Sequence, residues 1–332
     1  MVRLFSSHLS LVNYIMYNTG YTVEMQKPSE FYSFFCGKYV GKFFEYYAYI
    51  ALAGWVLVMI SGSGATIKTY FEVPEFIGTI LMGVLCAGAV CLGLKKLVNV
   101  LGFIGIVILI VTLALGGYII STADVGVFEM HVSQYVAEGK ILQPTVFGMK
   151  NAILSAFSYA GVLMFGCAAW VVSTGQMIKT KKQMVVTSVL SSLFYFTPLL
   201  AIIFIILLNV DTVVGTEIPL LVVVQNELPA LALPYTFIIV AAIFTTAAGM
   251  LFVVVNRFAK DKTMKFYIIT GGIVIFSVVV GTLIPFSTIL NFIYSIMGMS
   301  GIILSVFMVA KFIILIKKRE VPNRKTNNAP LN

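Results

Sequence analysis

The sequence predicts an all-α integral membrane protein, and three observations support that fold class. The 332 residues are 60% hydrophobic and only 11% charged, whereas charged residues make up about a quarter of a soluble globular chain. Several apolar runs are long enough to cross a bilayer as helices, which takes about 20 residues. These runs are also too long and continuous for the strands of a membrane β-barrel.

Eight spans are expected, each bounded by charge or by a turn. If they alternate strictly, nearly all of the 22 Lys and Arg residues fall on one side, and only Lys68, Lys140 and Lys150 fall on the other. The positive-inside rule makes the basic side cytoplasmic, so we expect a multi-pass protein of a bacterial cytoplasmic membrane with both termini in the cytoplasm. The expected spans are 43–67, 76–94, 97–121, 151–178, 184–208, 233–256, 266–286 and 289–316.

The segments outside the spans differ in character. Residues 1–42 contain a short apolar piece, Leu9–Tyr17, followed by a polar and aromatic segment that suits a helix at the membrane surface. Two long outer connections cover 122–150 and 209–232. The second is a helical lid over the outer mouth or an apolar loop at the lipid interface, and residues 319–332 form a basic cytoplasmic tail.

The span at Asn151–Ile178 carries the first candidate site, with Ser155, Ser158, Tyr159 and Gly161 in its first half. A lipid-facing helix gains nothing from these hydroxyls. A helix that unwinds near the bilayer midplane needs glycine and nearby polar groups, and such spans indicate the binding site of a transporter. The alternative is that the small residues let two unbroken helices pack closely.

Two further clusters are candidates. Trp55 and the run Met59–Thr66, with Ser61 and Ser63, could line a substrate site, although close helix packing explains the small residues equally well. Thr245 and Thr246 are adjacent at the centre of a span and could offer oxygens to a sodium ion. The alternative for these threonines is a bond from each hydroxyl to the carbonyl one turn earlier.

The absence of ionisable residues and catalytic motifs from the spans makes several classes of function improbable. Their interiors hold no ionisable residue; Glu45 and Lys311 lie near cytoplasmic ends. With no phosphate-binding loop, nucleophile elbow or metal-ligand cluster, we expect no enzyme, and no cofactor other than a sodium ion. The basic charge is explained by topology, so no nucleic-acid partner is expected. The expected partners are the lipid bilayer and a neutral or zwitterionic small-molecule substrate; the sequence leaves the oligomeric state open.

A family resemblance adds to this interpretation. From about Leu9 to Lys318 the chain resembles the YkvI-like bacterial membrane proteins, regarded as amino-acid permeases of the amino acid–polyamine–cation superfamily. The resemblance rests on the run VMISGSGA (Val58–Ala65), the spacing of spans, and the segment Ser155–Gly161 followed by STGQMIKTKKQM (Ser173–Met184).

The resemblance implies a leucine-transporter-like fold of two inverted five-helix repeats, with helices three to five over 43–121 and the second repeat over 151–318. It makes Asn151–Ile178 the broken sixth helix and places Thr245 and Thr246 in the eighth, where sodium-coupled members hold their ion. It also implies that the first helix and most of the second are lacking. The expected function is an alternating-access amino-acid permease, or an inactive truncated form of one. The alternatives are a non-transporting sensor, such as a germinant-receptor-like subunit, and a structural protein without a ligand.

Overall fold

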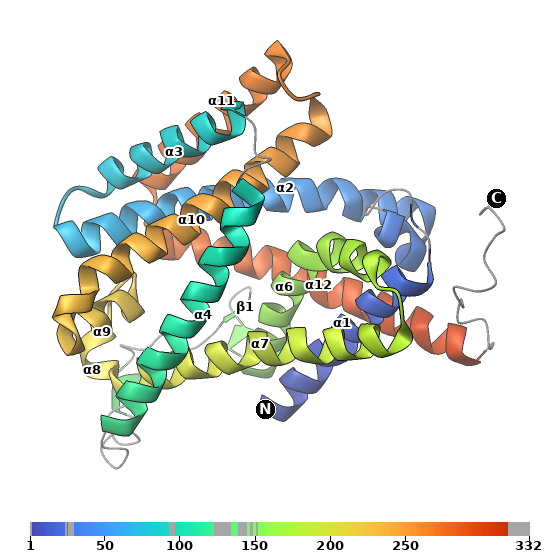
Figure 1. Cartoon of the computed structure of the whole chain (residues 1–332), viewed down its shortest axis with the longest axis horizontal. Helices are drawn as coiled ribbons and strands as arrows, with labels where there is room; N and C mark the ends of the chain where they lie inside the picture. The colour runs from blue at the N-terminus through green and yellow to red at the C-terminus, as the bar shows by residue number, and fades with distance from the viewer. Residues whose placement is uncertain are drawn as a thin grey trace. The chain divides into compact units, whose positions relative to one another are not determined.

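A computed structural model describes residues 2–23, 25, 30–92, 97–122, 134–138, 145–146, 149–150 and 152–317. Each of the eight expected spans coincides with a helix in it (Figure 1). These helices are α2 (Glu30–Phe71), α3 (Glu75–Leu92), α4 (Leu97–Thr122), α6 (Ala152–Met177), α7 (Lys181–Leu208), α10 (Pro229–Phe258), α11 (Met264–Leu283) and α12 (Phe286–Lys317). The other labelled elements are α1 (Val2–Thr22), α8 (Val210–Val213), α9 (Pro219–Glu227) and the paired strands β1 (Thr145–Val146) and β2 (Met149–Lys150).

Most of these helices have the length and composition of membrane spans. Within the described ranges, six are long and apolar enough to cross a bilayer, namely α2, α3, α7, α10, α11 and α12, and α6 is a seventh if its two bent segments form one span. In α4 the stretch Ile106–Ile119 is apolar but shorter. The chain is therefore a multi-pass helical membrane protein.

The helices form two compact units, and each unit combines distant parts of the chain. Helices α2, α7 and α12 contribute residues to both units. Unit 1 consists of Met1–Ala51, Pro144–Phe196 and Tyr294–Asn332, and unit 2 consists of Leu52–Gln143 and Thr197–Ile293.

In unit 1, α1 packs along α6. The short apolar piece expected at Leu9–Tyr17 is part of this 21-residue helix. Two glycines allow the close approach: a Cβ on Gly20 would overlap the carbonyl oxygen of Val172, and one on Gly175 would lie 2.7 Å from that of Tyr17. Beyond the apolar piece, the helix continues through Gly20, where it lies against α6.

Polar groups of α1 also find partners in unit 1. The amide nitrogen Nδ2 of Asn13 donates to the carbonyl oxygen of Ser188 at 3.1 Å and to the hydroxyls of Ser191 and Ser192 at 2.8 and 3.0 Å. An amide inside an apolar run is otherwise costly to bury, and three acceptors on α7 satisfy it. This explains why Asn13 does not end the helix.

The start of α2 differs from the surface helix expected there. Phe31 and Phe35 are buried in unit 1, whereas Tyr39 is exposed. The helix is interrupted at Gly37, whose φ of 77° suits glycine. The carbonyl oxygen of Phe34, in the turn before this break, accepts a hydrogen bond from the Lys311 ammonium group, which lies 4.2 Å from the centre of the Phe34 ring. A cation at the end of a helical segment is favourable, because the free carbonyls there carry partial negative charge.

Unit 2 has an apolar cluster formed by its part of α2 with α3, α10 and α11. Helices α3 and α11 lie side by side (Figure 1). Gly83 makes the approach possible, because a Cβ there would lie 2.6 Å from a methyl group of Val278. The buried members of this cluster include Val56, Ile60, Met82, Cys86, Leu251, Val255 and Phe266.

A second cluster in unit 2 joins α9 to α4, α7 and α10. Leu221, Val223 and Val224 of α9 are each at most 1% exposed, and they pack with Leu115 of α4 and Tyr235 of α10. The 209–232 connection thus forms packed helices, which favours its helical interpretation over the apolar-loop alternative.

Candidate functional site

Helix α6 is helical from Ala152 to Met177 and passes through Gly161 without interruption. Unwinding among the hydroxyls between Ser155 and Gly166 is therefore not observed. The helix does bend, by 55° between the segments Ile153–Ala168 and Trp170–Met177. The span is thus bent within its apolar length, as a broken helix would be, but the bend lies beyond Gly166 and not between Ser155 and Gly161.

The small residues of α6 bring it close to α12. A Cβ on Gly161 would overlap the carbonyl oxygen of Gly298 and lie 3.0 Å from the backbone nitrogen of Ile302. In return, a Cβ on Gly298 would overlap the hydroxyl oxygen of Ser158, which is 5% exposed. Gly161 and Ser158 thus lie in a close contact between two helices, as the packing alternative expects.

Tyr159 is the centre of a cluster of phenol groups contributed by three helices of unit 1. The Tyr195 hydroxyl of α7 donates to the Tyr159 hydroxyl at 2.9 Å. The rings of Tyr159 and Tyr294 of α12 are stacked, with centroids 5.9 Å apart and an interplanar angle of 17°. Buried tyrosines normally need a partner for the hydroxyl, and here the cluster supplies one to Tyr195.

Ser155 lies one turn before Tyr159, on the same face of α6. Its hydroxyl oxygen is buried and has no hydrogen-bond partner among the residues that the structure describes. An unsatisfied buried hydroxyl costs about 1–3 kcal/mol, so a group that bonds to it would be favoured. Ser155, Tyr159, Tyr195 and Tyr294 therefore form a cluster that can offer hydroxyls and aromatic faces to a small polar molecule; we call it the tyrosine cluster.

The other predicted substrate residues belong to unit 2. Trp55 packs against an apolar cluster that includes Val58 and Ile289. The Ser63 hydroxyl donates to the carbonyl oxygens of Ile60 at 2.7 Å and Gly78 at 3.3 Å. Ser63 therefore joins α2 to α3.

Ser61 is fully buried, and its hydroxyl has no hydrogen-bond partner within the described part of the chain. It faces Gly281 of α11, where a Cβ would lie 3.2 Å from the Cβ of Ser61. This is the close packing of small residues expected as the alternative.

The threonine pair expected to hold sodium lies in α10. Thr245 is 3% exposed, and its hydroxyl donates to the carbonyl oxygen of Ala242 at 3.0 Å. This is the local bond named above as the alternative to an ion site. Thr246, the next residue, is partly buried.

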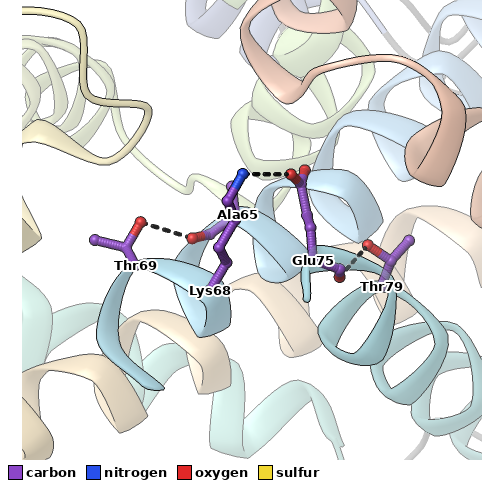
Figure 2. A network of polar contacts seen from close by, with 5 residues as sticks. All are labelled: Ala65, Lys68, Thr69, Glu75 and Thr79. Atoms are coloured by element: carbon purple, nitrogen blue, oxygen red, sulfur yellow. Dashed lines mark hydrogen bonds and ion pairs between the residues drawn. The ribbon is translucent and has the colours of Figure 1, made fainter. Parts of the chain in front are cut away.

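A polar network at the α2–α3 connection was not expected from the sequence. Figure 2 shows the Lys68 ammonium group directed at Glu75, with 3.4 Å between Nζ and Oε2. The Thr79 hydroxyl donates to the carbonyl oxygen of Glu75 at 3.0 Å, and the Thr69 hydroxyl donates to that of Ala65 at 2.8 Å. In the sequence, Lys68 and Glu75 are charged residues at the boundaries of predicted spans, where charges are common. No sequence signal therefore predicted that they pair.

Glu217, in the connection before α9, lies in the same electrostatic environment. Burial and the nearby Glu75 carboxylate raise its pKa, while Lys68 and hydrogen bonds from Ser287 act in the opposite direction. The segment leading into α9 is thus tied by polar contacts to the ends of other helices in unit 2.

The fold and these contacts define a class: a multi-pass helical membrane protein with a buried phenol and hydroxyl cluster in one of its units. Comparison of the chain with family models, curated proteins and solved structures found no match. Because no match suggests a function, the function is inferred from the tyrosine cluster.

Proposed function

We propose that this protein is a secondary transporter of amino acids or similar small zwitterions in a bacterial cytoplasmic membrane. The observation that supports this most is the tyrosine cluster, which combines an unpartnered Ser155 hydroxyl with three phenol groups inside a helical membrane unit. Binding sites of transporters lie between helices near the bilayer midplane. Transport would proceed by alternating access, in which helices move about that site.

The cluster suits the two ends of a zwitterion. The Ser155 hydroxyl, which has no partner among the described residues, can donate to a carboxylate, and such charge-assisted bonds are stronger than neutral ones. The faces of aromatic rings attract an ammonium group by about 0.5–2 kcal/mol. No charged side chain is needed for this recognition, in keeping with the composition of the spans.

Sodium coupling is part of the proposal, with Thr245 and Thr246 as the residues to test. The Thr245 hydroxyl uses its proton in the bond to Ala242, and its oxygen still has a lone pair for a cation. Replacing both threonines by valine removes these oxygens at nearly constant volume. If sodium binds here, uptake by this variant no longer depends on a sodium gradient.

Binding and flux are tested on the purified full chain. Amino acids are screened for thermal stabilisation, and each hit is then measured as radiolabelled uptake into vesicles with and without an inward sodium gradient. Tyr195→Phe removes the hydrogen bond that positions the Tyr159 phenol in the cluster and should therefore weaken binding about tenfold, or by about 1.4 kcal/mol. Tyr267→Phe, on α11 and 39% exposed, is the matched control. An equal effect of both variants, or no binding of any amino acid, would contradict the proposal.

A second candidate is a non-transporting sensor that binds the same class of ligand. The helical state of α6 from Ser155 through Gly161 favours it, because the backbone groups of these turns are not freed to bind a substrate. A sensor shows ligand-induced stabilisation but no saturable uptake into vesicles. Uptake that exceeds passive leakage would exclude this alternative.

A further inference from the structure

Unit 2 contains a cavity of about 440 Å³ between α4, α9 and α10. Aliphatic side chains and the rings of two tyrosines make up nearly all of its wall. The volume lies within the range of about 300–1,000 Å³ that is typical of ligand sites, and an apolar wall selects an apolar ligand. The lining residues used below are Val111, Ala114 and Tyr118 of α4 and Leu231, Pro234 and Ile238 of α10.

The mouth of this cavity opens between exposed residues of α4 and α10. Tyr118 and Leu231 are 46% and 54% exposed, and Ala114 and Pro234 are exposed as well. Ala114, Tyr118 and Pro234 lie within the predicted spans 97–121 and 233–256, so their exposed faces meet hydrocarbon in the membrane, and Leu231 lies at the outer edge of the second span. A ligand that enters here comes from the bilayer.

The cavity has a defined depth along its helices. Tyr118 and Val111 precede the end of α4 at Thr122 by about 6 and 17 Å, at about 1.5 Å per residue. Leu231 and Ile238 follow the start of α10 by similar distances, about 3 and 14 Å. The hydrocarbon core is about 30 Å thick, so the cavity occupies one leaflet, next to the α9–α10 connection.

We propose that this cavity binds one acyl chain of a membrane phospholipid from that leaflet. The surrounding medium supplies such chains at high concentration, and an empty cavity would deprive its lining atoms of dispersion contacts. The phospholipid headgroup then lies level with the start of α10. This site is separate from the tyrosine cluster and does not depend on the proposed transport function.

The test uses the full chain in vesicles of phosphatidylethanolamine and phosphatidylglycerol that contain a small fraction of phosphatidylcholine with a photoreactive diazirine in one acyl chain. After irradiation, labelled positions are mapped by mass spectrometry. We expect residues 111–118 and 231–238 to carry several-fold more label than the stretch of α3 around Val84, which is 65% exposed. Equal labelling of these regions would mean only the annular contact that any lipid-facing residue makes, and would overturn the proposal.

Two pairs of variants make the test specific. Ala114→Trp fills the cavity from α4 and should reduce labelling of α10 to the level at Val84. Leu231→Trp fills it from the other wall and should do the same to labelling of α4. Leu113→Trp and Leu233→Trp place the same ring on exposed neighbours in the same helices, outside the cavity lining, and should change neither. Unchanged labelling in both filled variants, or an equal loss in their controls, would overturn the proposal.

Discussion

Gly161 and Gly166 lie in the same helix but have different surroundings. A Cβ on Gly161 would overlap the Gly298 carbonyl oxygen of α12, whereas one on Gly166 would meet no atom within 4 Å. Gly161→Ala should therefore lower the free energy of unfolding by about 1–3 kcal/mol through overpacking. Gly166→Ala should be neutral or stabilise the helix by up to about 1 kcal/mol, because alanine restricts the unfolded chain.

Unfolding in detergent, followed by circular dichroism, measures both variants. A melting temperature of Gly161→Ala equal to that of Gly166→Ala would show that α6 and α12 do not approach as closely as the contacts indicate. The result also bears on function: loss of ligand binding in a Gly161 variant is informative only if that variant remains folded.

For single residues, the sequence indicated which positions were unusual but not what they do. Ser158 and Gly161 stand out because a lipid-facing helix needs neither, yet the same residue types serve close packing, and only the position of α12 distinguishes the two roles. Tyr195 and Tyr294 were missed because each is a single tyrosine in an apolar run. Their partnership with Tyr159 depends on how α6, α7 and α12 pack, which no local pattern encodes.

At the scale of elements, Glu217 makes the stability of the segment before α9 depend on pH. Burial is the main cause of the shift in the pKa of its carboxyl group. The Glu75 carboxylate acts in the same direction, whereas the Lys68 ammonium group and hydrogen bonds from Ser287 act against it. Its pKa in the folded protein is raised above the usual 4.5 of the unfolded chain. The folded state therefore binds this proton more tightly than the unfolded state does.

The sign of the effect follows from that difference. The stabilisation from this group is complete below the unfolded pKa and is lost as the pH rises through the raised folded pKa. Glu217→Gln keeps the neutral form at every pH, so this variant should match the wild type near pH 4 and melt at a higher temperature near pH 7. Melting curves across this range test it, with Glu227→Gln, at the exposed end of α9, as the control. A melting difference that does not change with pH would contradict this account.

The elements divide into those that apolar length predicts and those that it does not. All eight expected spans coincide with helices because each run is long enough to satisfy its own backbone in an apolar medium. Apolar length does not predict helices α1 and α9, because α1 contains polar residues and α9 is short. Both are stabilised by tertiary contacts: Asn13 of α1 has three acceptors on α7, and Val224 of α9 is buried against α4 and α10.

For the whole molecule, the distribution of charge predicts an orientation in the membrane. The connection between α10 and α11 carries Lys260 and Lys262, with Arg257 and Lys265 beside it, whereas the connection that contains α9 carries Asp211, Glu217 and Glu227 and no basic residue. Basic connections are retained on the cytoplasmic side. Because α10 joins the two connections and is long enough to cross the bilayer, they should lie on opposite sides, with α9 outside.

Cysteine labelling tests this orientation. In a chain whose four cysteines are replaced by serine, Asn226→Cys and Asp261→Cys each place one exposed thiol in one of the two connections. A membrane-impermeant maleimide should label Asn226→Cys in intact cells and should label Asp261→Cys only after the cells are opened. The reverse pattern would place the basic connections outside and invert the orientation. It would also transfer the acyl-chain cavity to the cytoplasmic leaflet, because that cavity lies beside the α9–α10 connection on whichever side the connection faces.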